Sequence, residues 1–121
     1  MTGHHLIADL CGAHQLTDAA HIEACLIAAA TAAGAKLLEV RLHSFGPGQG
    51  VTGVALLAES HISIHTWPEY GTACVDIFMC GPAHDLAAGL DAILVGLGAT
   101  IARSSIVERD FGGVPTQEGA R

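Results

Sequence analysis

The sequence predicts an α+β protein, a two-layer sandwich in which two helices pack on one face of a largely antiparallel sheet. Six segments have the apolar pattern of strands, and two have apolar residues at the three-and-four spacing of amphipathic helices. Most of the strands follow one another through short connections, which favours antiparallel pairing. We expect the sheet face without helices, or a sheet edge, to receive a second subunit or the ligand.

The chain opens with a predicted strand at residues 4–10, in which every second residue is apolar. Residues 18–33 have the apolar spacing of a helix. Thr17 is expected to cap the start of this helix, and Gly34 to close its end.

The next predicted strand, residues 36–45, has one apolar face made by Leu38, Val40 and Leu42. Residues 46–50 contain three glycines and a proline and are expected to form a loop. The remaining predicted elements are strands 51–58 and 60–66, a turn at 67–71, strand 72–79, helix 85–97, strand 99–108 and a mobile tail over the last dozen residues.

Length and composition predict a single domain, residues 1–121, that associates with itself. Half of the residues are apolar and only 14% are charged, so part of the surface is expected to be covered by another subunit. A net charge of −7 argues against binding to nucleic acid or anionic membranes, which requires a basic face.

Neither a membrane span nor a signal peptide is recognisable, because no run of about 18 apolar residues occurs and the N-terminus is not basic. The four cysteines show no Cys-x-x-Cys spacing. We therefore expect a cytoplasmic protein with free thiols, most of them buried.

Residues 59–81 carry an unusual concentration of reactive side chains. They include the only Trp, the only Tyr, two of the eight His and two of the four Cys. Taken singly, these residues are weak indicators: Ser60 lacks a Gly-x-Ser-x-Gly setting, and a Cys at the end of an apolar strand, as Cys80 is, more often belongs to a core.

Two further patterns are rejected on geometric grounds. Gly48-x-Gly50-x-x-Gly53 has the spacing of a dinucleotide fingerprint, but a strand pattern follows it, where that fingerprint needs a helix. His61 and His65 are four residues apart, which on a strand is roughly 13 Å and too far for a shared ion. A metal site assembled from residues distant in the sequence remains an alternative.

In combination, the motifs of this stretch closely resemble the small bacterial and archaeal S-adenosylmethionine decarboxylase proenzymes. The resemblance runs from the first strand to about Glu108 and is carried by Glu59-Ser60-His61, Ile64-His65-Thr66-Trp67-Pro68-Glu69-Tyr70-Gly71 and Asp76-Ile77-Phe78-Met79-Cys80-Gly81. It implies that the chain cuts itself between Glu59 and Ser60, into a β chain of residues 1–59 and an α chain of residues 60–121. It also implies that Ser60 becomes a covalently bound pyruvoyl group.

The chemistry implied by the resemblance is consistent with these residue types. The Ser60 hydroxyl attacks the Glu59 carbonyl, the resulting ester is eliminated, and hydrolysis leaves the pyruvoyl group. That group forms a Schiff base with the substrate amine and accepts the electrons left by carbon dioxide, so neither a metal nor pyridoxal phosphate is expected. By resemblance, His65 is the processing base and Cys80 the proton donor.

The weaker correspondences concern processing and substrate binding. Thr52 stands where relatives usually have Ser and keeps a hydroxyl for processing. Glu69 corresponds to a carboxylate that can bind ribose hydroxyls, Phe45 to an aromatic that can stack on adenine, and Trp67 faces the nucleoside. A position in the core is the alternative for Phe45.

Geometry predicts that the active site is shared between two protomers. On an extended strand, Ser60 and His65 lie roughly 16 Å apart on opposite faces. We therefore expect Ser60 and Cys80 of one protomer to work with His65 of its two-fold mate, together with the mate's Thr52 and Glu69.

The expected function is decarboxylation of S-adenosylmethionine to the aminopropyl donor for spermidine synthesis. One alternative is decarboxylation of a basic amino acid, arginine or ornithine, with the same pyruvoyl chemistry. Another is an uncleaved, inactive paralogue that acts as a partner. The presence of Ser60, His65 and Cys80 together argues against the inactive paralogue.

Overall fold

The computed structural model describes residues 2–81 and 83–112. Its elements, in chain order, are β1 (Thr2–Cys11), α1 (Ala19–Ala33), β2 (Leu37–Ser44), β3 (Val51–Leu57), β4 (Ser60–Trp67), the 3₁₀ turn η1 (Pro68–Tyr70), β5 (Thr72–Cys80), α2 (Leu86–Leu97) and β6 (Thr100–Asp110). Within the described residues, neither helix is long and apolar enough to cross a membrane.

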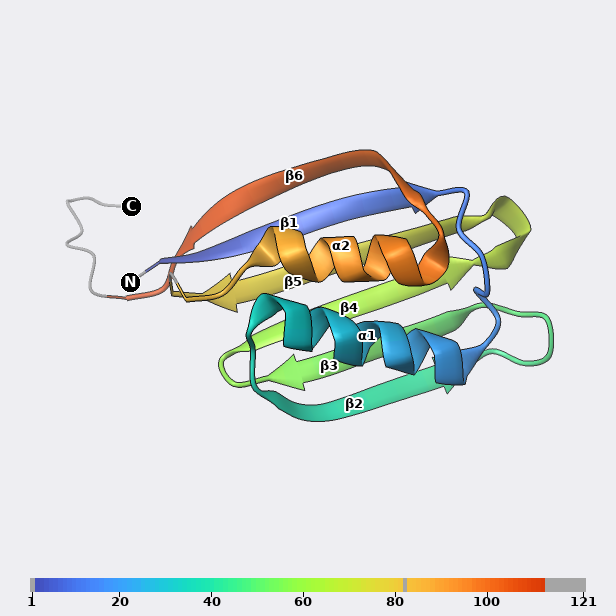
Figure 1. Ribbon diagram of the computed structural model, residues 1–121, viewed down its shortest axis with the longest axis horizontal. Coiled ribbons are helices and arrows are strands. Elements are labelled where there is room, and N and C mark those ends of the chain that lie inside the picture. Colours follow the sequence, from blue (N-terminus) through green and yellow to red (C-terminus); the bar gives the residue numbers. More distant parts are fainter. Residues whose placement is uncertain (1, 82, 113–121) are drawn as a thin grey trace.

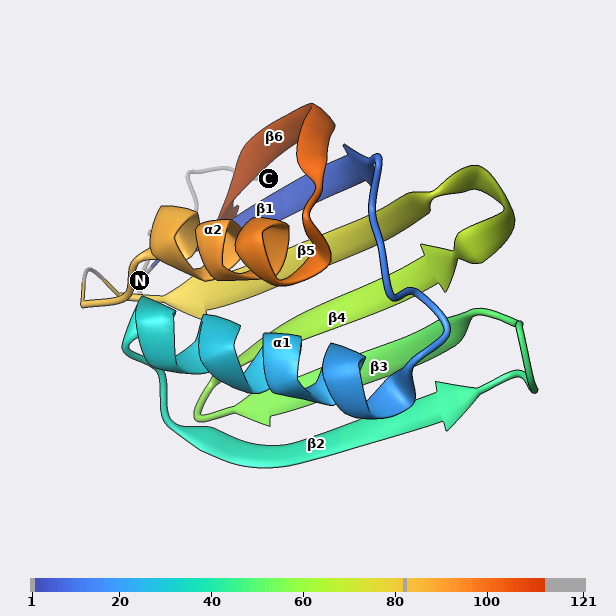
Figure 2. The ribbon, with the colours of Figure 1, turned by 45° about the vertical axis from the view of Figure 1, so that its right-hand side comes forward.

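The strands form one sheet in the order β2-β3-β4-β5-β1-β6, and every neighbouring pair is antiparallel. Both helices lie on the same face of this sheet, α1 over β2, β3 and β4, and α2 over β5 (Figure 1). The turned view shows both helices as one layer in front of the sheet (Figure 2). The predicted fold class is therefore confirmed.

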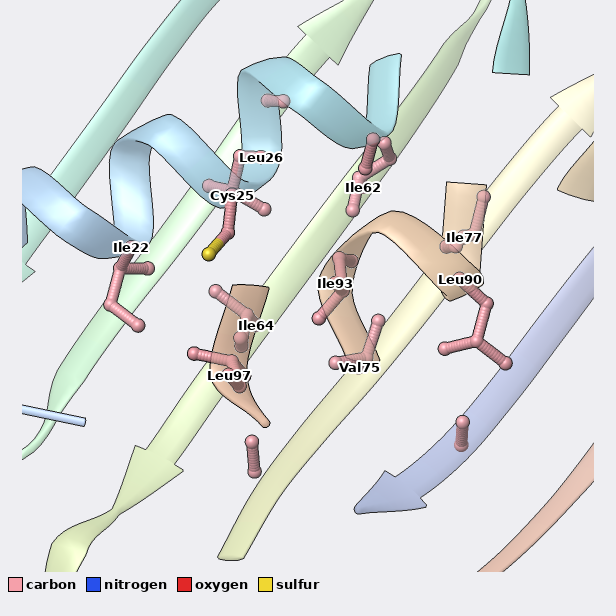
Figure 3. Close-up of a cluster of buried hydrophobic side chains, with 14 of the residues drawn as sticks. Ile22, Cys25, Leu26, Ile62, Ile64, Val75, Ile77, Leu90, Ile93 and Leu97 are labelled. Carbon is pink, nitrogen blue, oxygen red and sulfur yellow. The ribbon is translucent and has the colours of Figure 1, made fainter. Parts of the chain in front are cut away.

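The core lies between the helices and the front of the sheet (Figure 3). Strand alternation supplies one half of it, with Ile62 and Ile64 from β4 and Ile77 from β5 fully buried. The helices supply the other half, including Ile22 and Ile93. Because successive side chains of a strand point to opposite faces, the residues of β4 and β5 that alternate with these buried ones project onto the face without helices. We call this face the open face.

The predicted N-cap of the first helix was wrong. The N-cap of α1 is Asp18 and not Thr17, because the Asp18 carboxylate accepts a hydrogen bond from the His21 backbone N–H. Gly34 closes the helix in a left-handed conformation, as expected.

On β2, Leu38 is 60% exposed, while Leu37 packs against the core with Val40 and Leu42. The pairing register with β3 shifts between Leu37 and Glu39, and an irregularity of this kind changes which residue faces inward.

The end of the chain also differs from expectation. The strand β6 reaches Asp110, and the rest of the predicted tail lies outside the described residues apart from residues 111 and 112. Cysteines are mostly not buried: only Cys25 is buried, whereas Cys11 is exposed and Cys74 and Cys80 are half-buried.

The open face is a mixed surface. Large apolar side chains remain exposed there, with Ile7, Leu56, Trp67 and Val107 each at least 39% accessible. Polar side chains lie among them, including the pair Asp9 and Arg103. Exposed apolar side chains gathered on one face are typical of a surface that another protein covers.

Thr66 joins the start of α1 to the sheet. Its buried hydroxyl accepts from the Val51 N–H at 2.8 Å and donates to the Leu16 carbonyl at 2.8 Å. Replacement of Thr66 by Val leaves both backbone groups without this partner, so the free energy of unfolding is expected to fall by about 1–3 kcal/mol in urea titration.

A matched control is Thr72→Val, because the exposed Thr72 hydroxyl makes only a 3.3 Å hydrogen bond to the Tyr70 carbonyl. Its effect on the unfolding free energy is expected to stay within about 0.5 kcal/mol. Equal losses in the two variants would contradict this account of Thr66.

Candidate active site

The connection between β3 and β4 is a turn of two residues, Ala58 and Glu59. Glu59 has φ +62°, a left-handed conformation that a side chain with a Cβ rarely adopts. Such a conformation costs of order 1–3 kcal/mol, and the neighbouring strands maintain it here. The peptide bond predicted to be cut therefore follows a strained residue, which the sequence could not reveal.

Ser60, the first residue of β4, points toward the helices and is almost fully buried. Within the described residues, its Oγ is the buried side-chain oxygen without a hydrogen-bond partner. A buried hydroxyl is normally paired, so an unpaired one is a candidate for chemistry.

Cys80 ends β5 beside this turn, and its thiol donates to the Glu59 carbonyl oxygen over 3.0 Å. The three residues predicted for the cleavage end, Glu59, Ser60 and Cys80, are therefore brought together.

His84 also lies near this end, since its Nδ1 hydrogen-bonds the Cys80 carbonyl at 2.8 Å. The site residues expected from the sequence do not include His84. Its position four residues after Cys80, beyond the left-handed Gly81, is a feature that could have indicated this contact.

The other predicted residues line a cavity of about 310 Å³ at the opposite end of β3 and β4. Thr52 and His65 face each other across the two strands, and their Oγ1 and Nδ1 atoms are 3.1 Å apart. The His65 and Trp67 rings have centroids 6.2 Å apart. Further lining residues are Phe45, Gln49, Gly50, Thr66 and Glu69.

The loop before β3 shapes this cavity. A Cβ at Gly50 would lie 2.2 Å from the Thr66 carbonyl oxygen, so only glycine permits this approach of the loop to β4. Phe45 is 61% exposed and contacts His43 edge-on at a centroid distance of 4.6 Å. The core alternative for Phe45 is therefore wrong. Gln49 also lines the cavity, although the sequence indicated only that it belongs to the loop of residues 46–50.

The two groups lie at opposite ends of β4. Ser60 pairs with Leu57 at one end, His65 pairs with Thr52 near the other, and the two side chains point to opposite faces of the sheet. The first group contains a nucleophile and a thiol, and the second contains an imidazole and a cavity. Within one chain they cannot meet, in agreement with the predicted geometry.

Between the two groups, the open face carries a polar cluster around Asp76. The Asp76 carboxylate accepts hydrogen bonds from His5 at 2.6 Å and from His61 at 2.9 Å, and also from the Ser63 hydroxyl. Burial raises the pKa of Asp76, but these hydrogen bonds outweigh it, so the pKa lies below its usual value. The site residues expected from the sequence do not include His5, because the sequence does not show that β1 pairs with β5.

Cys74 lies two residues before Asp76 on β5 and on the same open face. Its pKa is raised, mainly by burial and further by the Asp9 carboxylate. This thiol is therefore poorly suited to act as a nucleophile near neutral pH.

Comparison with known proteins gives a consistent result. The sequence profile of a family described as S-adenosylmethionine decarboxylase matches residues 4–110. A crystal structure of the adenosylmethionine decarboxylase from Aquifex aeolicus is similar over 98% of this chain and 97% of that chain, with a TM-score of 0.76 and 34% sequence identity.

Curated relatives share the name S-adenosylmethionine decarboxylase proenzyme. One from Parasynechococcus marenigrum is 57% identical over 83 residues, which cover 67% of this chain and 64% of the relative. One from Carboxydothermus hydrogenoformans is 48% identical over 85 residues, which cover 69% and 66%. One from Methanococcus vannielii is 54% identical over 81 residues, which cover 65% and 66%. The matched part thus spans about two thirds of each relative's length.

Proposed function

Because the chain belongs to the S-adenosylmethionine decarboxylase family, we propose that it is a proenzyme that cuts itself between Glu59 and Ser60 and then decarboxylates S-adenosylmethionine. The products of the cut are a β chain, residues 1–59, and an α chain, residues 60–121, which remain one domain. The observation that carries this proposal is the unpaired, buried Ser60 Oγ next to a strained Glu59 whose carbonyl accepts a hydrogen bond from Cys80.

These features suit the first step of self-cleavage. The Cys80 thiol polarises the Glu59 carbonyl, and the strain at Glu59 is released when the peptide bond becomes an ester. A new bond forms between Ser60 Oγ and the Glu59 carbonyl carbon, and the amide bond between the two residues breaks, leaving the Ser60 amine free.

The later steps need a base for the Ser60 Cα proton. Loss of that proton expels Glu59 as a carboxylate, and water then replaces the nitrogen of residue 60, releasing ammonia and leaving the pyruvoyl group. His65 supplies the base, since the free nitrogen of a neutral imidazole can accept a proton. The Thr52 hydroxyl, 3.1 Å from His65 Nδ1, orients that ring.

We propose that His65 reaches Ser60 across a two-fold axis. Each open face would cover the other, so that one protomer's Cys80 thiol and the Glu59–Ser60 peptide bond beside it meet the cavity of its mate, while the uncut Ser60 side chain points to the helix side. The exposed apolar side chains of the open face support this arrangement, because pairing would remove them from water. Two αβ units then form two equivalent sites.

In the mature enzyme, the pyruvoyl carbonyl serves as the electron sink for decarboxylation. The cavity residues bind the nucleoside: Phe45 and Trp67 offer aromatic faces, and Glu69 is the one carboxylate among the described residues that line the cavity. A carboxylate there can accept hydrogen bonds from ribose hydroxyls and attract the positively charged sulfonium. Cys80 returns a proton to the substrate carbon after carbon dioxide leaves.

We further propose that the enzyme works in the cytoplasm, binds neither nucleic acid nor membranes, and supplies the aminopropyl donor for spermidine synthesis. The free cysteines support the cytoplasmic assignment, and the net charge of −7 argues against binding to nucleic acid or anionic membranes.

A substrate comparison tests the proposed function. The release of carbon dioxide from carboxyl-labelled S-adenosylmethionine, arginine and ornithine is measured with cleaved protein. We expect kcat/KM for S-adenosylmethionine to exceed that for either amino acid by at least about 10³-fold, because only the nucleoside occupies the aromatic cavity. Phe45→Ala should raise KM for S-adenosylmethionine by about tenfold. A preference for arginine or ornithine would favour the basic amino acid alternative.

A further inference from the structure

Three side chains that are typical metal ligands converge on the open face from three neighbouring strands. They are His5 on β1, His61 on β4 and Asp76 on β5. One ligand atom from each lies within 4.8 Å of the others. We propose that this cluster binds a divalent transition-metal ion of the zinc class.

Sheet register places the ligands. His5 and His61 pair with Phe78 from its two sides, and Asp76 lies two residues along β5 on the same face. The two imidazole Nε2 atoms approach Asp76 Oδ2 to 2.6 and 2.9 Å. Tetrahedral zinc with bonds of about 2.0–2.1 Å needs ligand atoms about 3.3 Å apart. Each imidazole therefore has to move away from Asp76 Oδ2 by less than about 1 Å to make room for an ion.

The donor set indicates which metals fit. Two imidazoles with one carboxylate suit zinc, iron, cobalt or nickel, whereas magnesium and calcium prefer oxygen ligands only. The three side chains are 20%, 36% and 26% exposed, in the order His5, His61 and Asp76. These exposures are those of a single protomer, so an ion can enter from solvent before two open faces meet.

Neighbouring groups hold the ligands in place. The Ser63 hydroxyl donates to Asp76 Oδ1, which leaves Oδ2 directed at the two imidazoles. Phe78 contacts both rings, with centroid distances of 5.7 Å to His5 and 6.1 Å to His61. Supporting contacts of this kind fix the orientation of ligands in metal sites.

One neighbour opposes the ion. Arg109 Nη1 lies 3.3 Å from His5 Nδ1, which must accept this hydrogen bond. When Nε2 of the neutral ring binds a metal, Nδ1 carries the proton and can no longer accept. Arg109 then has to turn away, and its charge repels the ion. Removal of this charge should therefore strengthen metal binding.

If the chain is cut as proposed above, the metal ligands come from both of its products. His5 belongs to the β chain, whereas His61 and Asp76 belong to the α chain. An ion bound by all three would link the two products of self-cleavage. It would also fix residue 61 and so restrain the adjacent pyruvoyl end beside Cys80.

The test uses tag-free Ser60→Ala protein, so that metal binding is measured whether or not self-cleavage occurs. After treatment with a chelator, the protein is titrated with Zn²⁺ against a coloured indicator and with Co²⁺ by visible absorption. We expect one ion per chain and a cobalt spectrum without a thiolate band. His61→Gln or Asp76→Asn should weaken Zn²⁺ binding by at least about 100-fold.

Two further variants keep the result interpretable. His4→Gln alters the neighbouring histidine, which lies on the opposite face of β1, and should leave Zn²⁺ affinity unchanged. Arg109→Gln should increase Zn²⁺ affinity by about tenfold, a gain that misfolding would not produce. Absence of stoichiometric binding, a thiolate band, or equal affinity in the His61→Gln and unsubstituted proteins would overturn the proposal. An uncut wild-type chain would refute the proposed function but not the metal site.

Discussion

Replacement of Ser60 by Ala is expected to leave the protein as a single uncut chain without decarboxylase activity. Alanine has no hydroxyl to attack the Glu59 carbonyl, so neither the ester nor the pyruvoyl group can form. Since the substrate then lacks its electron sink, kcat/KM should fall by more than about 10⁶-fold, the lower end of typical enzymatic accelerations. Denaturing electrophoresis and the release of labelled carbon dioxide measure the two effects.

The matched control is Ser104→Ala, which removes an exposed hydroxyl from β6. This variant should be cut and active like the wild type. The fold of the Ser60→Ala protein should persist, because the Ser60 hydroxyl has no hydrogen-bond partner to lose. Cleavage of the Ser60→Ala protein at the same bond would show that another nucleophile is responsible.

A dimer formed from one Ser60→Ala chain and one His65→Ala chain is expected to recover activity that neither parent has. Each parent dimer lacks the same group at both sites. The mixed dimer has one site with both substitutions and one site with neither, because Ser60 of one protomer works with His65 of the other. Purified through two different tags, it should show about half of wild-type activity. His65→Ala alone should process about 10²–10⁴-fold more slowly.

The negative control pairs Ser60→Ala with Cys80→Ala. Cys80 contacts Glu59 within its own chain, so these substitutions affect the same half of the site. Every site in that mixed dimer lacks one of the two groups, and no activity should appear. Activity in this control, or none in the Ser60 and His65 pair, would refute the shared site.

Much of the fold could be predicted because apolar alternation is strict where one face is buried. Leu6, Ala8 and Leu10 on β1 are all buried, as their spacing indicated. Leu38 was predicted to lie on the apolar face of its strand but is exposed, because the irregular pairing of β2 with β3 turns Leu37 inward in its place. Nothing in a single sequence marks such a shift on an edge strand.

The sequence could name candidate site residues, but it could not show the backbone conformation and the strand pairings that position them. The motif pointed to Ser60, His65 and Cys80 as candidates, and their positions on strands predicted that Ser60 and His65 would lie apart. The left-handed φ of Glu59 depends on a two-residue turn whose conformation the sequence does not fix. The cluster around Asp76 depends on β1 lying next to β5, a long-range pairing that local patterns do not contain.

Self-cleavage is tested by the intact mass of freshly purified, denatured wild-type protein. We expect two chains that divide between Glu59 and Ser60, the second with a pyruvoyl group in place of its N-terminal serine and therefore blocked to Edman degradation. A single chain with the full mass of 12.3 kDa would contradict self-cleavage and favour the inactive paralogue.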